Sequence, residues 1–203
     1  MKRAGTLVFM VTMLAVLAGC VSPDAEVLKM RELRRTNWAF VIIDIQKAYL
    51  PFFNQGKVIQ AALSLRGKAD EAGVPVIYLR QNDSDVRPGT SSWEFHPSIS
   101  PRDTDIVIDK EYPSGFTGTT LSDVMTEFGI ETIAAVGIST GHCYAATVYD
   151  AVNRGYNVIV VSDGHSNHYP NARELIDSYN VRFADQEAIL VVPSGDIDIP
   201  GRR

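Results

Sequence analysis

The stretch TIAAVGISTGHCYAATVYDAVNRGYNVIVVSDG, residues 132–164, contains the pattern that decides the fold. It opens with an apolar run, Thr132–Ile138, and closes with a second one, Asn157–Ser162. The segment His142–Arg154 between them is typical of a helix, and Gly155 follows it as a stop signal. Strands that are apolar throughout and are joined by helices belong to parallel sheets covered on both faces. We therefore predict a parallel sheet between two layers of helices.

The same alternation of apolar runs and helical patterns continues on both sides of this stretch. The other predicted strands are Trp38–Asp44, Val74–Leu79, Asp105–Asp109 and Ala188–Val192. The other predicted helices are Gln60–Ala72 with Gly73 as its stop, Thr119–Phe128 with Gly129 just past it, and Asn171–Tyr179. The pattern predicts an α/β protein, a three-layer α/β/α sandwich with a doubly wound, six-stranded, Rossmann-like parallel sheet.

The composition places the chain in a broad class. Its 203 residues are 45% hydrophobic and 21% charged, which is ordinary for one globular domain. Its formal net charge is −5, whereas nucleic-acid binding normally requires a basic face. We therefore expect no nucleic-acid partner.

The first twenty residues have the composition of an export signal. Lys2 and Arg3 precede an apolar run that is too short to span a bilayer, and Leu17-Ala18-Gly19-Cys20 closes it. This tetrapeptide resembles the bacterial lipobox, which implies that Cys20 is lipidated and anchors the protein in the cell envelope, at the outer membrane or the periplasmic face. An ordinary signal peptide or a buried amphiphilic helix is the alternative. The predicted organisation is a signal at 1–20, a tether or short helix at 21–36 and one globular domain at 37–203.

Cys143 is the one cysteine left once Cys20 is assigned to the lipobox, so it has no internal disulfide partner. It lies near the predicted start of a helix, where unpaired amide groups and the helix dipole favour a thiolate and lower the pKa of a thiol. The same amides could stabilise an oxyanion. A buried structural cysteine is the alternative, and position alone does not separate the two interpretations.

Two charged residues follow other predicted strands. Asp44 ends the first strand, where a partly desolvated carboxylate could accept the proton of a thiol, although an aspartate there is also a common turn former. Lys110 follows the third strand, where its ammonium could stabilise negative charge, unless it is a solvated surface lysine. Because ligands bind beyond the carboxyl ends of parallel strands, Asp44, Lys110 and Cys143 form a nucleophile, a base and a cation in one predicted pocket.

Three motifs now resemble a known family. The block GISTGHCYAATVYDAVNRGYNVIVVSDG (137–164) looks like the signature of the isochorismatase-like cysteine hydrolase superfamily, which includes the nicotinamidases. Asp44 in IIDIQKAY (42–49) is similar to its Asp-x-Gln motif on the first strand. Lys110 in IDKEYPSGFTGTTL (108–121) is similar to its Lys followed by Phe-x-Gly-Thr-x-Leu. The resemblance spans residues 38 to about 192.

The resemblance implies a catalytic triad of Asp44, Lys110 and Cys143. It also implies a cis peptide bond at Ile138–Ser139, and an oxyanion hole made by the amides of Ser139 and Cys143. The implied reaction is hydrolysis of a small amide or related C–N bond: the thiolate attacks, an amine or ammonia leaves, and water hydrolyses the thioester.

The chain also departs from this family. Nicotinamidases have an Asp-x-His metal motif after the second strand, whereas YLRQNDSDVRPG (78–89) has no histidine there, so we expect no metal and no other cofactor. His142 beside the nucleophile could line the pocket, and His165 and His168 could reach its mouth without forming a metal pair. Trp93, Phe116 and Tyr149 are candidate walls for a small planar substrate; ordinary core packing is their alternative.

Two other functions remain open at this point. One is vinyl-ether hydrolysis of the isochorismatase type, although the intact triad favours amide chemistry. The other is a non-catalytic, lipid-anchored binding or thiol-redox protein in which Cys143 is merely oxidisable. The expected partners are a small-molecule substrate and a membrane. The sequence leaves the substrate and the oligomeric state open, although relatives commonly associate through helices beside the pocket.

Overall fold

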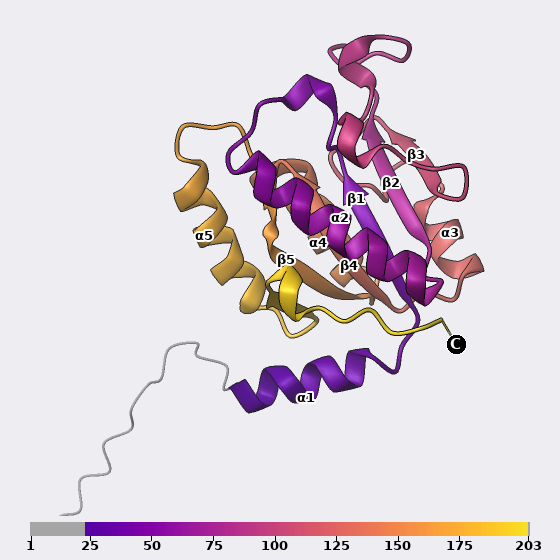
Figure 1. Ribbon diagram of the computed structural model, residues 1–203, viewed down its shortest axis with the longest axis vertical. Coiled ribbons are helices and arrows are strands. Elements are labelled where there is room, and N and C mark those ends of the chain that lie inside the picture. The colour runs from indigo at the N-terminus through magenta and orange to yellow at the C-terminus, as the bar shows by residue number, and fades with distance from the viewer. Residues whose placement is uncertain (1–22, 203) are drawn as a thin grey trace, which may run out of the picture.

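Six parallel strands form a single sheet in the computed structural model, which describes residues 23–202 (Figure 1). The order across the sheet is β3-β2-β1-β4-β5-β6, and every neighbouring pair is parallel. The strands are β1 (Trp38–Ile43), β2 (Val76–Gln81), β3 (Ile106–Lys110), β4 (Thr132–Ile138), β5 (Asn157–Ser166) and β6 (Ile189–Val192). The predicted three-layer, doubly wound parallel sheet is confirmed.

Helices cover both faces of this sheet. They are α1 (Pro23–Leu33), α2 (Gln55–Ala72), α3 (Leu121–Glu127), α4 (Ala145–Asn153) and α5 (Ala172–Ala184). The helix predicted from Gln60 begins earlier, at Gln55, and ends at the predicted stop, where Gly73 adopts a left-handed conformation. The helix predicted from His142 begins later, at Ala145, because a π-type turn, Thr140–Tyr144, precedes it.

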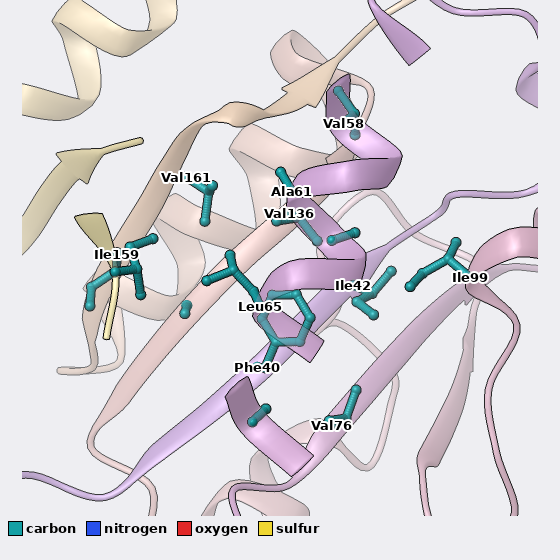
Figure 2. Close-up of a cluster of buried hydrophobic side chains, with 14 of the residues drawn as sticks. Phe40, Ile42, Val58, Ala61, Leu65, Val76, Ile99, Val136, Ile159 and Val161 are labelled. Atoms are coloured by element: carbon teal, nitrogen blue, oxygen red, sulfur yellow. The ribbon is translucent and has the colours of Figure 1, made fainter. Parts of the chain in front are cut away.

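Alternate residues of the central strand build two hydrophobic cores. On β1, Phe40 and Ile42 face α2 and pack against Leu65 and its neighbours (Figure 2). Val41 and Ile43 point to the opposite face, where the core includes residues of α3, α4 and α5. Because successive side chains of a strand point to opposite faces, an uninterrupted apolar strand is stable only when both faces are covered. The sheet is therefore held rigidly, and its carboxyl edge can position reactive side chains.

The segment predicted as a tether or short helix is helical and contacts the domain. Leu33, at the end of α1, is buried, and Lys29 donates hydrogen bonds to the carbonyl oxygens of Glu187 and Ile189. Burial lowers the pKa of Lys29. Arg34, just beyond the helix, forms an ion pair with Asp198. At least the second half of this segment is thus part of the folded unit.

The predicted signal and the lipidation site at Cys20 lie outside the described residues. Within residues 23–202, no helix is both long and apolar enough to cross a bilayer.

Glycine is required where β4 passes β1 next to the carboxyl edge. Gly137 has a φ of 148°, and a Cβ at this position would lie 2.3 Å from the carbonyl oxygen of Ile43. Ile43 and Gly137 are direct neighbours in the parallel register. Any side chain at position 137 would push apart the two strands that carry Asp44 and the Cys143 turn.

We predict that Gly137→Ala lowers the free energy of unfolding by about 2 kcal/mol, as expected for overpacking against backbone. Gly67→Ala is the matched control, because a Cβ at Gly67 in α2 meets nothing within 4 Å. That variant should raise stability by about 0.5–1 kcal/mol through its effect on helix propensity. Urea denaturation curves measure both changes. Equal stabilities for the two variants would contradict the close approach.

Candidate active site

A cavity of about 280 Å³ lies at the carboxyl edge of the sheet. Asp44 follows β1, Gln81 ends β2, Lys110 ends β3, and Cys143 lies in the turn after β4. Its lining residues are Asp44, Tyr49, Gln81, Asp83, Glu111, Pro113, Ile138, Ser139, His142, Cys143, His168 and Tyr169. The sheet thus brings the three predicted catalytic side chains to one place, as expected for a doubly wound fold.

Asp44 and Lys110 form an ion pair in the interior. Asp44 Oδ2 lies 2.8 Å from Lys110 Nζ, and both side chains are almost completely buried. Neither Asp44 oxygen has a hydrogen bond of standard geometry among the described residues; its polar neighbours include the Lys110 ammonium and the Cys143 thiol. Burial raises the pKa of Asp44, and the positive charge of Lys110 opposes that rise. Asp44 is therefore a carboxylate with an unusually strong tendency to take up a proton.

Gln81 connects this pair to the thiol. Its Oε1 accepts a hydrogen bond from Lys110 Nζ and lies 4.0 Å from Cys143 Sγ. Gln46 holds Gln81 in turn, because its Oε1 accepts the amide of Gln81 and its Nε2 donates to the carbonyl oxygen of Gln81. Gln81 was not predicted as a site residue, although a polar residue at the end of an apolar strand is the same signal that identified Asp44.

Cys143 lies in the turn that precedes α4, two residues before the helix begins. His142 departs from helical geometry, with φ −128° and ψ −107°, and this kink exposes its imidazole beside the thiol. His142 Nδ1 lies 3.2 Å from Cys143 Sγ. Cys143 is 7% exposed, so a reagent must enter the cavity to reach it.

The expected lowering of the thiol pKa is not observed. The pKa of Cys143 is raised to about 12, because burial and the negative charge of Asp44 outweigh the opposing charge of Lys110. The predicted lowering of the pKa by the helix terminus is wrong because Cys143 lies in the turn before α4 and because the Asp44 carboxylate lies next to it. The resting site therefore contains a neutral thiol beside a base.

The turn has the predicted cis peptide bond at Ile138–Ser139. Ser139 and Cys143 both line the cavity, so their amides remain candidates for an oxyanion hole.

Only one of the four predicted pocket residues lines the cavity. His142 lines the cavity, and the other three lie outside its lining. The Trp93 ring stacks against the Arg80 guanidinium at 3.3 Å. Phe116 is buried against Tyr156, with ring centroids 5.7 Å apart, and Tyr149 on α4 packs on Phe183. These three rings pack against other side chains, as the alternative interpretation proposed. The prediction that they line the pocket is wrong because aromatic character alone does not show which face of an element a ring covers.

The two remaining histidines have different surroundings. His168 lines the cavity, whereas His165 is buried beneath the turn, between Thr140 Oγ1 at 3.0 Å and Asn180 Oδ1 at 2.9 Å. Burial lowers the pKa of His165 to about 4, so it is neutral. In the described part of the chain, no three His, Cys, Asp or Glu side chains form a group that could hold a metal ion. That the reaction needs no metal stays a prediction.

Five further lining residues were not predicted. Tyr49 lies in a short 3-10 helix, and Asp83, Glu111, Pro113 and Tyr169 lie in loops. Glu111 directly follows Lys110, but periodicity does not show where a loop side chain points.

The comparison with a family profile decides the relationship. The profile of the isochorismatase domain matches residues 38–183, which is most of the described chain. The chain belongs to the isochorismatase family. The predicted superfamily is therefore confirmed.

Individual proteins that are similar to this isochorismatase-family chain include two hydrolases and one solved structure. It is 28% identical over 159 residues to the streptothricin hydrolase of Streptomyces noursei, covering 74% of this chain and 63% of that protein. It is 29% identical over 110 residues to the maleamate amidohydrolase of Pseudomonas putida, covering 52% of each chain. A cysteine hydrolase structure from Pseudomonas syringae pv. phaseolicola 1448A has a TM-score of 0.74 at 24% identity, covering 81% of this chain and 90% of that one, which shows a shared fold.

We predict that the alkylation rate of Cys143 by iodoacetamide rises with pH without a plateau up to pH 10, because the thiol pKa is raised to about 12. Asp44→Asn removes the nearby negative charge, so the thiol pKa falls and alkylation at pH 8 becomes faster. Asp103→Asn, an exposed aspartate before β3, should leave the profile unchanged. Mass spectrometry of the Cys143 peptide follows the reaction. A plateau near pH 7 in the unsubstituted protein would show a low thiol pKa and contradict this description.

Proposed function

We propose that this protein is a cysteine hydrolase that cleaves a small amide or related non-peptide C–N bond through a thioester on Cys143. The observation that carries the proposal is the buried Asp44–Lys110 ion pair next to the Cys143 thiol in a cavity at the carboxyl edge of the sheet. A structural cysteine requires neither a buried carboxylate nor a buried ammonium, and both charges are costly to bury. The substrate is a small molecule, because the cavity is slightly below the size range of about 300–1,000 Å³ for sites of drug-sized ligands.

The first half of the reaction forms the thioester. Asp44 accepts the proton of Cys143 as Sγ attacks the carbonyl carbon, and the carbonyl π electrons move to the oxygen. The amides of Ser139 and Cys143 donate hydrogen bonds to this oxyanion. When the C–N bond breaks, Asp44 returns the proton to the leaving nitrogen, and the acyl group stays on Sγ.

The second half releases the acid. Asp44 accepts a proton from water, whose oxygen attacks the thioester carbon, and the C–S bond breaks. The sulfur then takes back the proton and the resting thiol is restored. The raised pKa of Asp44 suits both halves, because a general base works best when its proton affinity approaches that of the group it deprotonates. Lys110 keeps the carboxylate charged in the interior between the two transfers.

The relatives support this reaction class. One is named a streptothricin hydrolase and another a maleamate amidohydrolase. This chain spans 63% and 52% of those two proteins, so their substrates do not transfer to it.

Substitution of the triad tests the proposal. We predict that Cys143→Ala, Asp44→Asn and Lys110→Met each lower kcat/KM by at least about 10²-fold in an ammonia-release screen of small amides, carbamoyl compounds and ureides. Cys143→Ser removes the thiol while nearly preserving the volume of the side chain. Asp103→Asn is the neutral control. Circular dichroism checks that each variant folds. Turnover by Cys143→Ala at the unsubstituted rate would refute the thioester route.

Further assays of the same variants separate the other interpretations. Hydrolysis of a vinyl ether that survives in Cys143→Ala would indicate isochorismatase-type chemistry. Reversible oxidation of Cys143 with no turnover on any compound would indicate a thiol-redox protein. Loss of activity on treatment with a chelator, restored by zinc, would overturn the expectation of metal-free catalysis.

We also propose, from the sequence alone, that the chain is anchored to the bacterial cell envelope through lipidated Cys20. The proposal rests on the basic start, the short apolar run and Leu17-Ala18-Gly19-Cys20. Full-length protein from cells fed radiolabelled palmitate should carry label and partition into detergent, and Cys20→Ala should abolish both. Label that remains in Cys20→Ala would show that the anchor is elsewhere.

A further inference from the structure

Acidic side chains and two histidines, His142 and His168, line the cavity around Cys143. Asp83 and Glu111 line it together with the catalytic Asp44. Among residues 23–202, no arginine or lysine belongs to this lining. Lys110 does not change the balance, because its charge is buried and paired with Asp44. The charge that an entering molecule meets is therefore negative.

Asp83 is fixed in its charged form by the loop after β2. Its Oδ1 accepts the amides of Asp85 and Val86, and its Oδ2 accepts a hydrogen bond from Gln81 Nε2. Burial opposes the ionisation of Asp83, but these hydrogen bonds outweigh it and lower its pKa. Gln81 thus links this peripheral charge to the reactive thiol, 4.0 Å from its Oε1.

Two tyrosines provide aromatic surface beside these charges. Tyr49 and Tyr169 line the cavity, and Tyr169 is 47% exposed at its mouth. Burial raises the pKa of Tyr49, and the negative charges of Asp44, Asp83 and Asp85 add to that rise. Carboxylates next to aromatic faces are the surroundings in which proteins bind ammonium and guanidinium groups.

We propose that the substrate carries a positive charge: a small amide or ureide with an ammonium or guanidinium group, held by Asp83, Glu111 and the faces of Tyr49 and Tyr169. This inference rests on the proposed hydrolase function and names its substrate class. The buried Asp44 carboxylate, which has no hydrogen bond of standard geometry within residues 23–202, faces the same cavity and reacts at the amide end. A carboxylate-bearing substrate would meet like charge without an arginine to pair with it.

Thiol labelling tests the charge preference independently of hydrolysis. Three methanethiosulfonates transfer a substituted ethyl group of different charge: the ethylammonium, the neutral 2-hydroxyethyl and the sulfonatoethyl reagents. Their rates with Cys143 in the full chain at pH 8, each divided by the rate with 2-mercaptoethanol, should favour the cation over the anion by about tenfold or more, as in clefts lined by one sign of charge. High salt should reduce the ratio. Mass spectrometry of the Cys143 peptide excludes signal from Cys20.

Variants locate the charge that is responsible. Glu111 has no ion pair among the described residues, so Glu111→Gln should lower the cation-to-anion ratio, and Glu111→Lys should lower it further. Glu127→Lys is the control, because Glu127 is exposed at the end of α3, at the opposite edge of the sheet. A ratio that changes equally in Glu111→Lys and Glu127→Lys, or an anion that reacts as fast as the cation, would overturn the inference.

Turnover gives the second readout. Among matched primary amides, 4-aminobutanamide should have a higher kcat/KM than pentanamide, and succinamate should have the lowest. Glu111→Lys should reverse the order of the two charged amides. Cation-selective labelling with no turnover of any amide would support the charge inference and count against the hydrolase proposal. Faster turnover of succinamate would support the hydrolase and overturn the charge inference.

Discussion

The buried ion pair between Asp44 and Lys110 is the interaction on which the rest of the site depends. Each charge alone would cost several kcal/mol to bury, and removing either one leaves the other without a partner. The pair joins the ends of β1 and β3, which are separated in the sheet by β2. Gln81, at the end of β2, hydrogen-bonds Lys110 and is itself held by Gln46. The rigid parallel sheet makes this arrangement possible, because its two apolar cores hold the carboxyl ends in register.

The pair also explains why the thiol is neutral at rest. A nucleophilic cysteine is commonly activated by a nearby cation, which lowers its pKa. Here the cation is already paired, and burial with Asp44 raises the pKa of Cys143. In the proposed reaction, proton transfer to Asp44 therefore accompanies the attack, which would tie the reactivity of Cys143 to a substrate that fills the cavity. The lining carboxylates of Asp83 and Glu111 add a reason for such a substrate to be cationic.

The sequence predicted the fold well, because each strand contains an apolar run and because Gly73 and Gly129 follow α2 and α3. Thr132–Ile138 matches β4 residue for residue. Asp44, Lys110 and Cys143 were found because the carboxyl ends of parallel strands meet at one edge. The turn that delays α4 and the thiol pKa depend on contacts between distant residues, so periodicity could not reveal them. Phe116 and Tyr149 were predicted to line the pocket but pack elsewhere, because the chemistry of a ring does not show which neighbour it contacts.

The most direct test of this account is the covalent state of Cys143 during turnover. Full-length protein is mixed with an amide that it hydrolyses, and the reaction is quenched in acid within one turnover. The Cys143 peptide is then analysed by mass spectrometry. A parallel sample contains hydroxylamine. The account predicts the substrate's acyl group on the Cys143 peptide, and the matching hydroxamate in the parallel sample. Hydrolysis that yields neither the acyl peptide nor the hydroxamate would show that water attacks the substrate directly, and would contradict the account.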